Sequence, residues 1–207
     1  MNNIAHLCDA YKFSHPPQYP EGITKVYSNW TIRGSYIPDL KHYVFYGLQY
    51  FIKEYLINRW NKEFFNVPKD IVIPKLKRRL KNALDIIDVT HYEKLHDLGY
   101  LPIEIKALPE GSRVSLRVPC LTIVNTLPEF YWVTNMLETL LSTTLWGAIN
   151  SATISDLYTQ IKNKYLKLTC DDASLKDFLQ HDFSYRGMFC NEAALLNEVR
   201  ERLLQNG

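Results

Sequence analysis

A proline-rich segment near the start of the chain, DAYKFSHPPQYP at residues 9–20, gathers side chains that could bind a ligand. It offers a carboxylate, a phenol, an ammonium group and an imidazole, from Asp9, Tyr11, Lys12 and His15. Loops of this kind often carry binding and catalytic residues. The alternative is an N-terminal arm that tyrosine packing holds against the body of the protein. The residues alone leave both interpretations open.

A second segment, HDFSYRG at residues 181–187, packs an acid, an imidazole, two aromatic rings and a guanidinium together before an expected helix. Arg186 near a helix start suits a phosphate, because guanidinium donors and free backbone amides both match its oxygens. The alternative is a surface ion pair between Asp182 and Arg186, which would contribute little to stability.

Arg33 stands at the end of an expected strand, where a single arginine is most often solvated surface. The sequence contains no GxGxxG or GxxxxGK[ST] phosphate loop, no Ser-His-Asp order signature and no HExxH zinc helix. The residues by themselves therefore indicate aromatic and phosphate-binding loops and do not specify a reaction.

Composition indicates a globular protein, and the net charge does not indicate any class of binding partner. The chain has 207 residues, of which 46% are hydrophobic and 13% aromatic, enough for one large domain or one and a half small ones. Its formal net charge is only +2, so no overall field favours nucleic acid or an anionic membrane, and we expect neither as a partner.

The beginning of the sequence, residues 1–11, lacks the basic-then-apolar pattern of a signal peptide. No apolar stretch reaches the length that spanning a bilayer needs, so we expect a cytoplasmic protein. The four cysteines lack CxxC spacing and are expected to be reduced thiols rather than disulfides or zinc ligands: Cys8, Cys120, Cys170 and Cys190.

The first half of the chain contains three elements that can position these segments. Residues 23–33 are rich in β-branched and aromatic types after a turn cluster, which predicts a strand. Residues 44–58 place apolar side chains at helical spacing. Residues 75–87, KLKRRLKNALDII, predict an amphipathic helix whose basic face is a solvated surface, with a nucleic-acid patch as the alternative.

The second half changes from strands to helices. Residues 101–125 are short apolar runs broken by proline and glycine, which predicts two or three strands. Pro128 opens a helical run through Trp146, and a second helix is expected over roughly 149–167. The final run, 191–207, predicts an amphipathic helix that ends in Asn-Gly.

Six collinear segments resemble the nicotinamide phosphoribosyltransferase family over residues 9–187. They are DAYKFSHPPQYP, KVYSNWTIR, VFYGLQYFIKEYL, LPIEIKALPEGS, NTLPEFYWVTNMLETLL and HDFSYRG. The resemblance implies an α+β fold, with the N-terminal α+β domain of a type II phosphoribosyltransferase over 1–147. Residues 148–207 would then start an incomplete α/β barrel, with a divergent amphipathic tail from 188.

The resemblance implies an enzyme that joins nicotinamide to 5-phosphoribosyl 1-pyrophosphate, giving nicotinamide mononucleotide and pyrophosphate in NAD salvage. Mg²⁺ would accompany the phosphates. The family pattern also allows ATP use, although the phosphorylated His of the family has no counterpart in this chain. Family members are homodimers with active sites at the subunit interface, so we expect a homodimer or a completing partner chain.

The resemblance also implies roles for five residues. Tyr11 of one subunit and Phe183 of the other would sandwich the pyridine ring, since flat rings bind well between aromatic faces. Arg186 would hold phosphate or pyrophosphate oxygens. Arg33 would reach phosphates across the interface, and Asp9 would help to order the loop that carries Tyr11.

The family pattern stops after Gly187, where Met188 and Phe189 precede a charged helix instead of a Gly-rich segment. The family's later ribose-phosphate residues have no positions here, so we expect the chain alone to be inactive. It would be a split subunit or a truncated product. The alternative is a non-catalytic interaction or regulatory protein that keeps the dimerisation surface and packs through a tail at Asn191–Gln205.

Overall fold

The computed structural model describes residues 3–170, 174, 176 and 179–196, and these have the mixed helix and sheet structure that an α+β fold predicts. The strands are β1 (Tyr27–Thr31), β2 (His42–Val44), β3 (Ile103–Ala107), β4 (Arg113–Ser115) and β5 (Pro119–Asn125). The α-helices are α1 (Leu48–Tyr50), α2 (Lys69–Leu84), α3 (Thr90–Leu98), α4 (Val133–Met136), α5 (Glu138–Thr169) and α6 (Ser184–Gly187). Short 3-10 turns form η1 (Ile4–His6), η2 (Ala10–Ser14), η3 (Pro16–Gln18) and η6 (Pro128–Phe130), and π-helical turns form η4 (Phe51–Arg59) and η5 (Asn61–Phe65).

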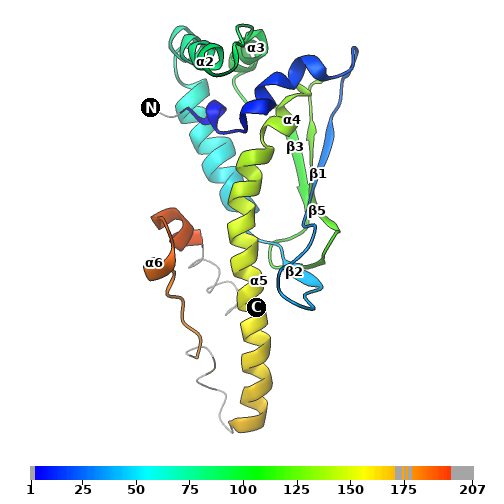
Figure 1. Cartoon of the computed structure of the whole chain (residues 1–207), viewed down its shortest axis with the longest axis vertical. Helices are drawn as coiled ribbons and strands as arrows, with labels where there is room; N and C mark the ends of the chain where they lie inside the picture. The colour runs from blue at the N-terminus through cyan, green and yellow to red at the C-terminus, as the bar shows by residue number, and fades with distance from the viewer. Residues whose placement is uncertain (1–2, 171–173, 175, 177–178, 197–207) are drawn as a thin grey trace. The chain divides into compact units, whose positions relative to one another are not determined.

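A three-stranded sheet has the order β1-β5-β3 (Figure 1). Its central strand, β5, is the apolar run PCLTIVN, which suits the middle position because both of its edges are paired. β3 pairs with it antiparallel, and Ile105 lies opposite Ile123. The strand predicted within 23–33 and the strands predicted within 101–125 are confirmed.

A two-stranded antiparallel sheet joins β2 to β4, with Tyr43 opposite Val114. The helix predicted over 44–58 was therefore wrong at its start, because Val44 still belongs to β2 and helical structure begins at Leu48. Periodicity cannot separate a short buried strand from the first turn of a buried helix. Gly47, with a φ of +99°, makes the change of direction between the two.

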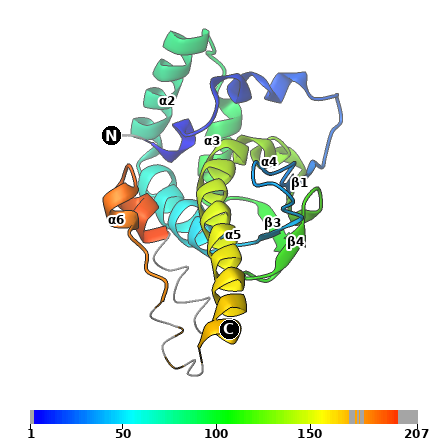
Figure 2. The same ribbon diagram turned by 60° about the horizontal axis from the view of Figure 1, so that its bottom comes forward.

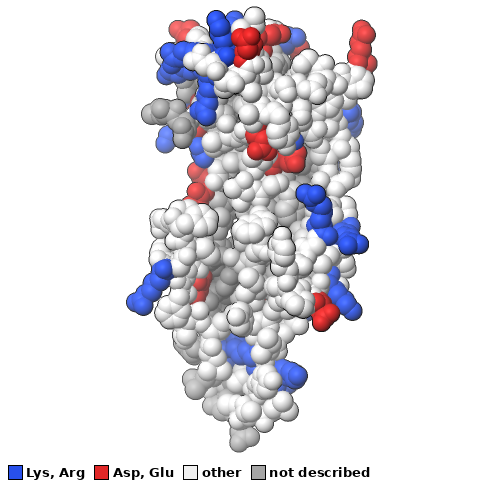
Figure 3. All heavy atoms as spheres, in the orientation of Figure 1, with Lys and Arg blue, Asp and Glu red and all other residues white. Residues whose placement is uncertain are grey.

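The helical layer at α2 and α3 follows from amphipathic spacing (Figures 1 and 2). α2 packs against α3 and buries four apolar residues, Val72, Ile73, Leu76 and Leu80. The basic residues between them are exposed, and Figure 3 shows acidic side chains among the lysines and arginines at this end. The amphipathic helix is confirmed, and its mixed charge favours a solvated surface over a nucleic-acid patch.

One helix, α5, runs from Glu138 to Thr169, where two helices were expected with a break near residue 147. That expectation was wrong. Gly147 lies inside the helix with no atom within 4 Å of where its side chain would begin. A helical glycine costs only about 1 kcal/mol, and the apolar residues on either side outweigh that cost. Ala148 and Ala152, for example, are buried against Val44 and Tyr46.

The chain forms two compact units, counting the described residues within their bounds. The first takes in Met1–Trp30, Leu48–Ala107 and Leu121–Thr143. The second takes in Thr31–Gly47, Leu108–Cys120 and Thr144–Gly207. Both units are discontinuous in sequence, and the family-based boundary at residue 147 stays a prediction.

The tail predicted as an amphipathic packing surface is described only in part. Residues 191–196 are helical, and 197–207, with the Asn-Gly cap, lie outside the described residues.

Among the helices that the structure describes, none combines the length and hydropathy needed to cross a bilayer. None of the four cysteines forms a disulfide, and burial raises the pKa of the Cys8 thiol to about 12, so this thiol is protonated at neutral pH.

Candidate functional site

The N-terminal segment that carries Tyr11 folds as consecutive 3-10 turns, η2 and η3. Asp9 precedes η2, and its carbonyl accepts a hydrogen bond from the Lys12 amide at 2.9 Å. Pro16 starts η3 because proline's fixed φ suits a first helical position and its missing N–H is not needed there. The segment is thus an ordered arm of short turns, which we call the N-terminal arm (residues 9–19).

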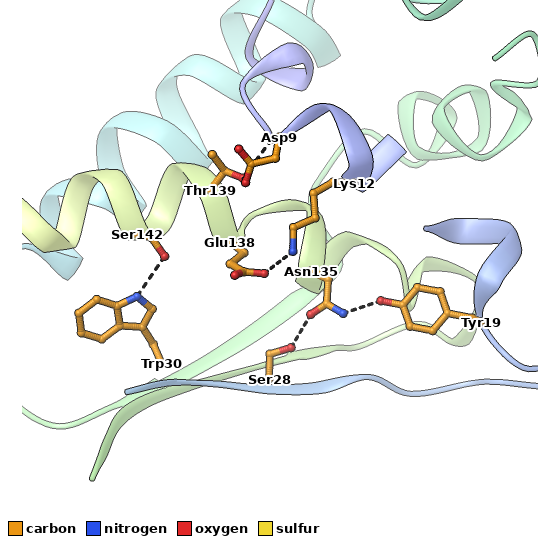
Figure 4. A network of polar contacts seen from close by, with 9 residues as sticks. All are labelled: Asp9, Lys12, Tyr19, Ser28, Trp30, Asn135, Glu138, Thr139 and Ser142. Carbon is orange, nitrogen blue, oxygen red and sulfur yellow. Dashed lines mark hydrogen bonds and ion pairs between the residues drawn. The ribbon is translucent and has the colours of Figure 1, made fainter. Parts of the chain in front are cut away.

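A row of polar side chains on α4 and α5 faces this arm and β1 (Figure 4). It consists of Asn135, Glu138, Thr139 and Ser142, and we call it the polar stripe. Their spacing of i, i+3, i+4 and i+7 places them on one helical face. The spacing of Asn135, Glu138 and Thr139 is visible in NTLPEFYWVTNMLETLL, and Ser142 follows directly after that segment, so the sequence held a signal for these residues that motif reasoning missed.

Two members of the stripe hold the residues on either side of Tyr11. The Thr139 hydroxyl donates to the Asp9 carboxylate at 2.7 Å and accepts from the Asp9 amide at 3.1 Å. Lys12, whose side chain is only 6% exposed, forms an ion pair with Glu138. A buried ammonium is costly without such a partner, so the carboxylate at the start of α5 is needed to keep Lys12 in place.

The other two members of the stripe hold the end of the arm and β1. The Asn135 amide donates to the Tyr19 hydroxyl at 2.5 Å and accepts from the Ser28 hydroxyl at 2.8 Å. The Trp30 indole donates to Ser142 at 3.3 Å. The arm and the strand are therefore fixed to one helical face (Figure 4).

Tyr11 itself projects from this anchored turn with 55% of its surface exposed. Its ring centroid lies 5.2 Å from that of His15, and the Lys12 ammonium lies 5.3 Å from the same centroid. The structure thus presents an aromatic face on a fixed backbone, an arrangement that can stack a flat ring.

Arg33 follows β1 and is exposed, and its carbonyl accepts a hydrogen bond from the Arg117 side chain at 3.4 Å. Arg33 belongs to the second compact unit, whereas Asp9 and Tyr11 belong to the first. Its guanidinium forms no ion pair with a residue that the structure describes.

Phe183 and Arg186 lie together at α6 in the second unit. Phe183 precedes the helix and is 66% exposed, and its carbonyl accepts from the Arg186 amide at 2.9 Å. Asp182 accepts from both the amide and the hydroxyl of Ser184. The alternative of an Asp182–Arg186 ion pair was wrong, because no such pair forms among the described residues and the Asp182 carboxylate bonds to Ser184 instead.

The first unit also contains an open cleft of about 470 Å³ beside α3. Trp132 and His91 line it, with ring centroids 4.8 Å apart, and the indole N–H of Trp132 has no partner among the described residues. Burial lowers the pKa of His91 to about 4, so its imidazole is neutral at pH 7.

No group of three or more His, Cys, Asp or Glu in the described part of the chain could hold a metal ion.

Comparison of the sequence with those of known proteins places this chain in a family. Residues 3–105 match the family described as nicotinamide phosphoribosyltransferase, N-terminal domain. The chain is 47% identical over 90% of its length to the nicotinamide phosphoribosyltransferase of Acinetobacter baylyi, and it covers 38% of that protein. The enzyme of the same name from Mycoplasma genitalium is 32% identical, with 91% of this chain and 45% of that protein covered.

A further relative of that name, from Xanthomonas campestris, is 31% identical over 91% of this chain and 38% of its own length. Among solved structures, human nicotinic acid phosphoribosyltransferase matches 71% of this chain and 27% of its own, with 21% identity and a TM-score of 0.49. The chain spans 38–45% of the length of these curated relatives. With 47% identity sustained over 90% of its residues, the chain belongs to the nicotinamide phosphoribosyltransferase family, and its residues 3–105 are that family's N-terminal domain.

Proposed function

We propose that this chain supplies the nicotinamide-stacking part of a nicotinamide phosphoribosyltransferase, which joins nicotinamide to 5-phosphoribosyl 1-pyrophosphate in NAD salvage. The observation that carries the proposal is the 47% identity to the Acinetobacter baylyi enzyme over 90% of the chain. Because the chain covers 38% of that enzyme, we further propose that it makes nicotinamide mononucleotide only when the remaining part is supplied.

Two exposed aromatic rings support the stacking role. Tyr11 is 55% exposed and Phe183 is 66% exposed, so each ring is open to a ligand. A pyridine ring placed between them would bury both faces and gain offset stacking contacts. In the proposed enzyme the two rings come from two copies of this chain, one in each subunit of a homodimer.

The two arginines are available for phosphate. Arg33 and Arg186 are exposed and form no ion pair within the described residues, so a phosphoribosyl pyrophosphate would not have to displace a carboxylate. Their planar donors match phosphate oxygens. As the bond to pyrophosphate breaks, negative charge grows on the leaving group, and guanidinium groups bound to its oxygens would stabilise it.

Asp9 has a supporting role in this proposal. Its carboxylate and amide both bond to Thr139, so its contribution is to hold the turn before Tyr11. Mg²⁺ would arrive with the phosphates, and no metal-holding cluster exists among the described side chains, so we assign it to no residue of this chain.

The test is an assay of nicotinamide mononucleotide from nicotinamide, 5-phosphoribosyl 1-pyrophosphate and Mg²⁺. The purified chain is measured alone and together with the part of the Acinetobacter baylyi enzyme that follows the region it matches. We expect product only in the mixture, and a loss of that product when the chain carries Tyr11→Ala. Turnover by the chain alone would contradict its proposed dependence on the missing part, and a silent mixture would contradict the enzymatic role.

A further inference from the structure

We propose that Glu138 and Thr139 are positioning residues that set the ring of Tyr11 for the pyridine substrate. This inference rests on the proposed function, because it concerns the same stacking site. Neither side chain would touch the substrate. They would act through Lys12 and Asp9, which stand one residue after and two residues before Tyr11.

The first support is the pair of anchors around Tyr11 (Figure 4). Asp9 is bound through both its amide and its carboxylate by a single hydroxyl, that of Thr139. Lys12 is bound through its ammonium by Glu138. Neighbouring residues at the start of α5 therefore hold both ends of the turn, and the backbone of Tyr11 has little freedom between them.

The second support is the double role of the Lys12 ammonium. It pairs with Glu138 and also lies 5.3 Å from the centroid of the Tyr11 ring, within the range of a cation–π contact. The position of the Glu138 carboxylate thus decides where the cation lies, and the cation occupies one side of the ring. Without that carboxylate, a side chain that is 6% exposed would be left unpaired and would move toward water.

The third support is the exposure of Tyr11. Among the described residues its ring makes one ring contact, with His15, and one cation–π contact, with Lys12, and 55% of the residue is open. The anchored backbone turn therefore contributes to the orientation of the ring. If the turn were loose, a ligand would have to order it on binding, which weakens affinity for the group that stacks there.

The experiment uses the completed enzyme described under the proposed function. Thr139→Val removes the hydroxyl at nearly constant shape, and Glu138→Gln removes the charge that pairs with Lys12. We expect each to raise the KM for nicotinamide about three- to tenfold, as loss of one or two hydrogen bonds would. The KM for 5-phosphoribosyl 1-pyrophosphate and kcat should stay within about twofold, because the phosphate contacts and the departing group are untouched.

Two controls separate positioning from general destabilisation. Thr139→Ser keeps the hydroxyl and should restore the KM for nicotinamide. Ser142→Ala removes another bond of the polar stripe, one that holds Trp30 on β1 rather than the N-terminal arm, and should leave that KM unchanged.

The decisive comparison is a double-mutant cycle with Tyr11→Ala. If Glu138 acts through the ring, Glu138→Gln should add nothing to the nicotinamide KM once the ring is gone. Additive effects, equal rises in both KM values, or an unchanged nicotinamide KM in the single variants would each overturn the inference while the wild-type enzyme remained active. Lack of activity in the wild-type mixture would instead refute the proposed function.

Discussion

Replacing Gly47 by alanine should destabilise the second unit more than any other Gly→Ala change whose surroundings are described. Gly47 has a φ of +99°, and an added Cβ would lie 2.6 Å from the Cβ of Ala148. A positive φ costs a non-glycine residue about 1–2 kcal/mol. Overpacking a filled site adds about 1–3 kcal/mol. We therefore expect a loss of about 2–5 kcal/mol in the free energy of unfolding, the sum of these two terms.

Gly99→Ala is the matched control, because it isolates the backbone term. Gly99 has a φ of +79°, and nothing lies within 4 Å of its would-be Cβ. Its alanine variant should lose only about 1–2 kcal/mol. Urea unfolding followed by tryptophan fluorescence measures both losses, provided that the m-value is unchanged.

A second comparison isolates the steric term. In the double variant Gly47→Ala/Ala148→Gly the overlapping methyl group is gone, so the two changes should be less than additive by about 1 kcal/mol or more. The reasoning is refuted if Gly47→Ala costs no more than Gly99→Ala, or if the two changes at 47 and 148 are strictly additive.

Three further predictions concern other sites. Thr153→Val should cost about 1–3 kcal/mol in urea unfolding, because the buried amide of Val44 donates to the Thr153 hydroxyl at 3.0 Å, whereas Thr153→Ser should cost less. The free energy of unfolding should fall by up to about 3 kcal/mol as the pH drops from 6.5 to about 4, because His91 binds its proton at a higher pH in the unfolded chain than in the folded one. Urea unfolding of wild type and His91→Phe at pH 7 and pH 5 tests this, and the free energy of unfolding should fall more between these two pH values in the wild type. In the completed enzyme, Tyr11→Ala and Phe183→Ala should each weaken nicotinamide binding by about 1–3 kcal/mol by calorimetry, and unchanged affinity in both would return these rings to a structural role.

The elements that sequence periodicity predicted well are those with a strong local signal. The strand at Tyr27–Thr31 lies in a segment rich in β-branched and aromatic residues, and the helix at Lys69–Leu84 has apolar residues at helical spacing. The errors came where the local signal was ambiguous. Residues 44–46 carry apolar side chains that fit either a strand or a helix, and only pairing with β4 makes Val44 part of a strand.

In α5, Gly147 suggested a helix boundary that tertiary packing overrides. Gly147 weakens a helix, but buried contacts of Ala148 and Ala152 with β2 and its following residues outweigh that local penalty. Helix α3, at Thr90–Leu98, was not predicted at all, and its identity as a helix depends on a left-handed cap at Gly99 and on packing against α2.

By itself, the sequence was sufficient to determine the family, the α+β class and the candidate residues Asp9, Tyr11, Arg33, Phe183 and Arg186, because motifs and periodicity are local properties. The roles of these residues stay predictions. Only the tertiary structure decided that the turn around Tyr11 is held by residues more than a hundred positions away, at the start of α5. A polar side chain at helical spacing shows which face it lies on, but its partner is chosen by the three-dimensional arrangement that buries both.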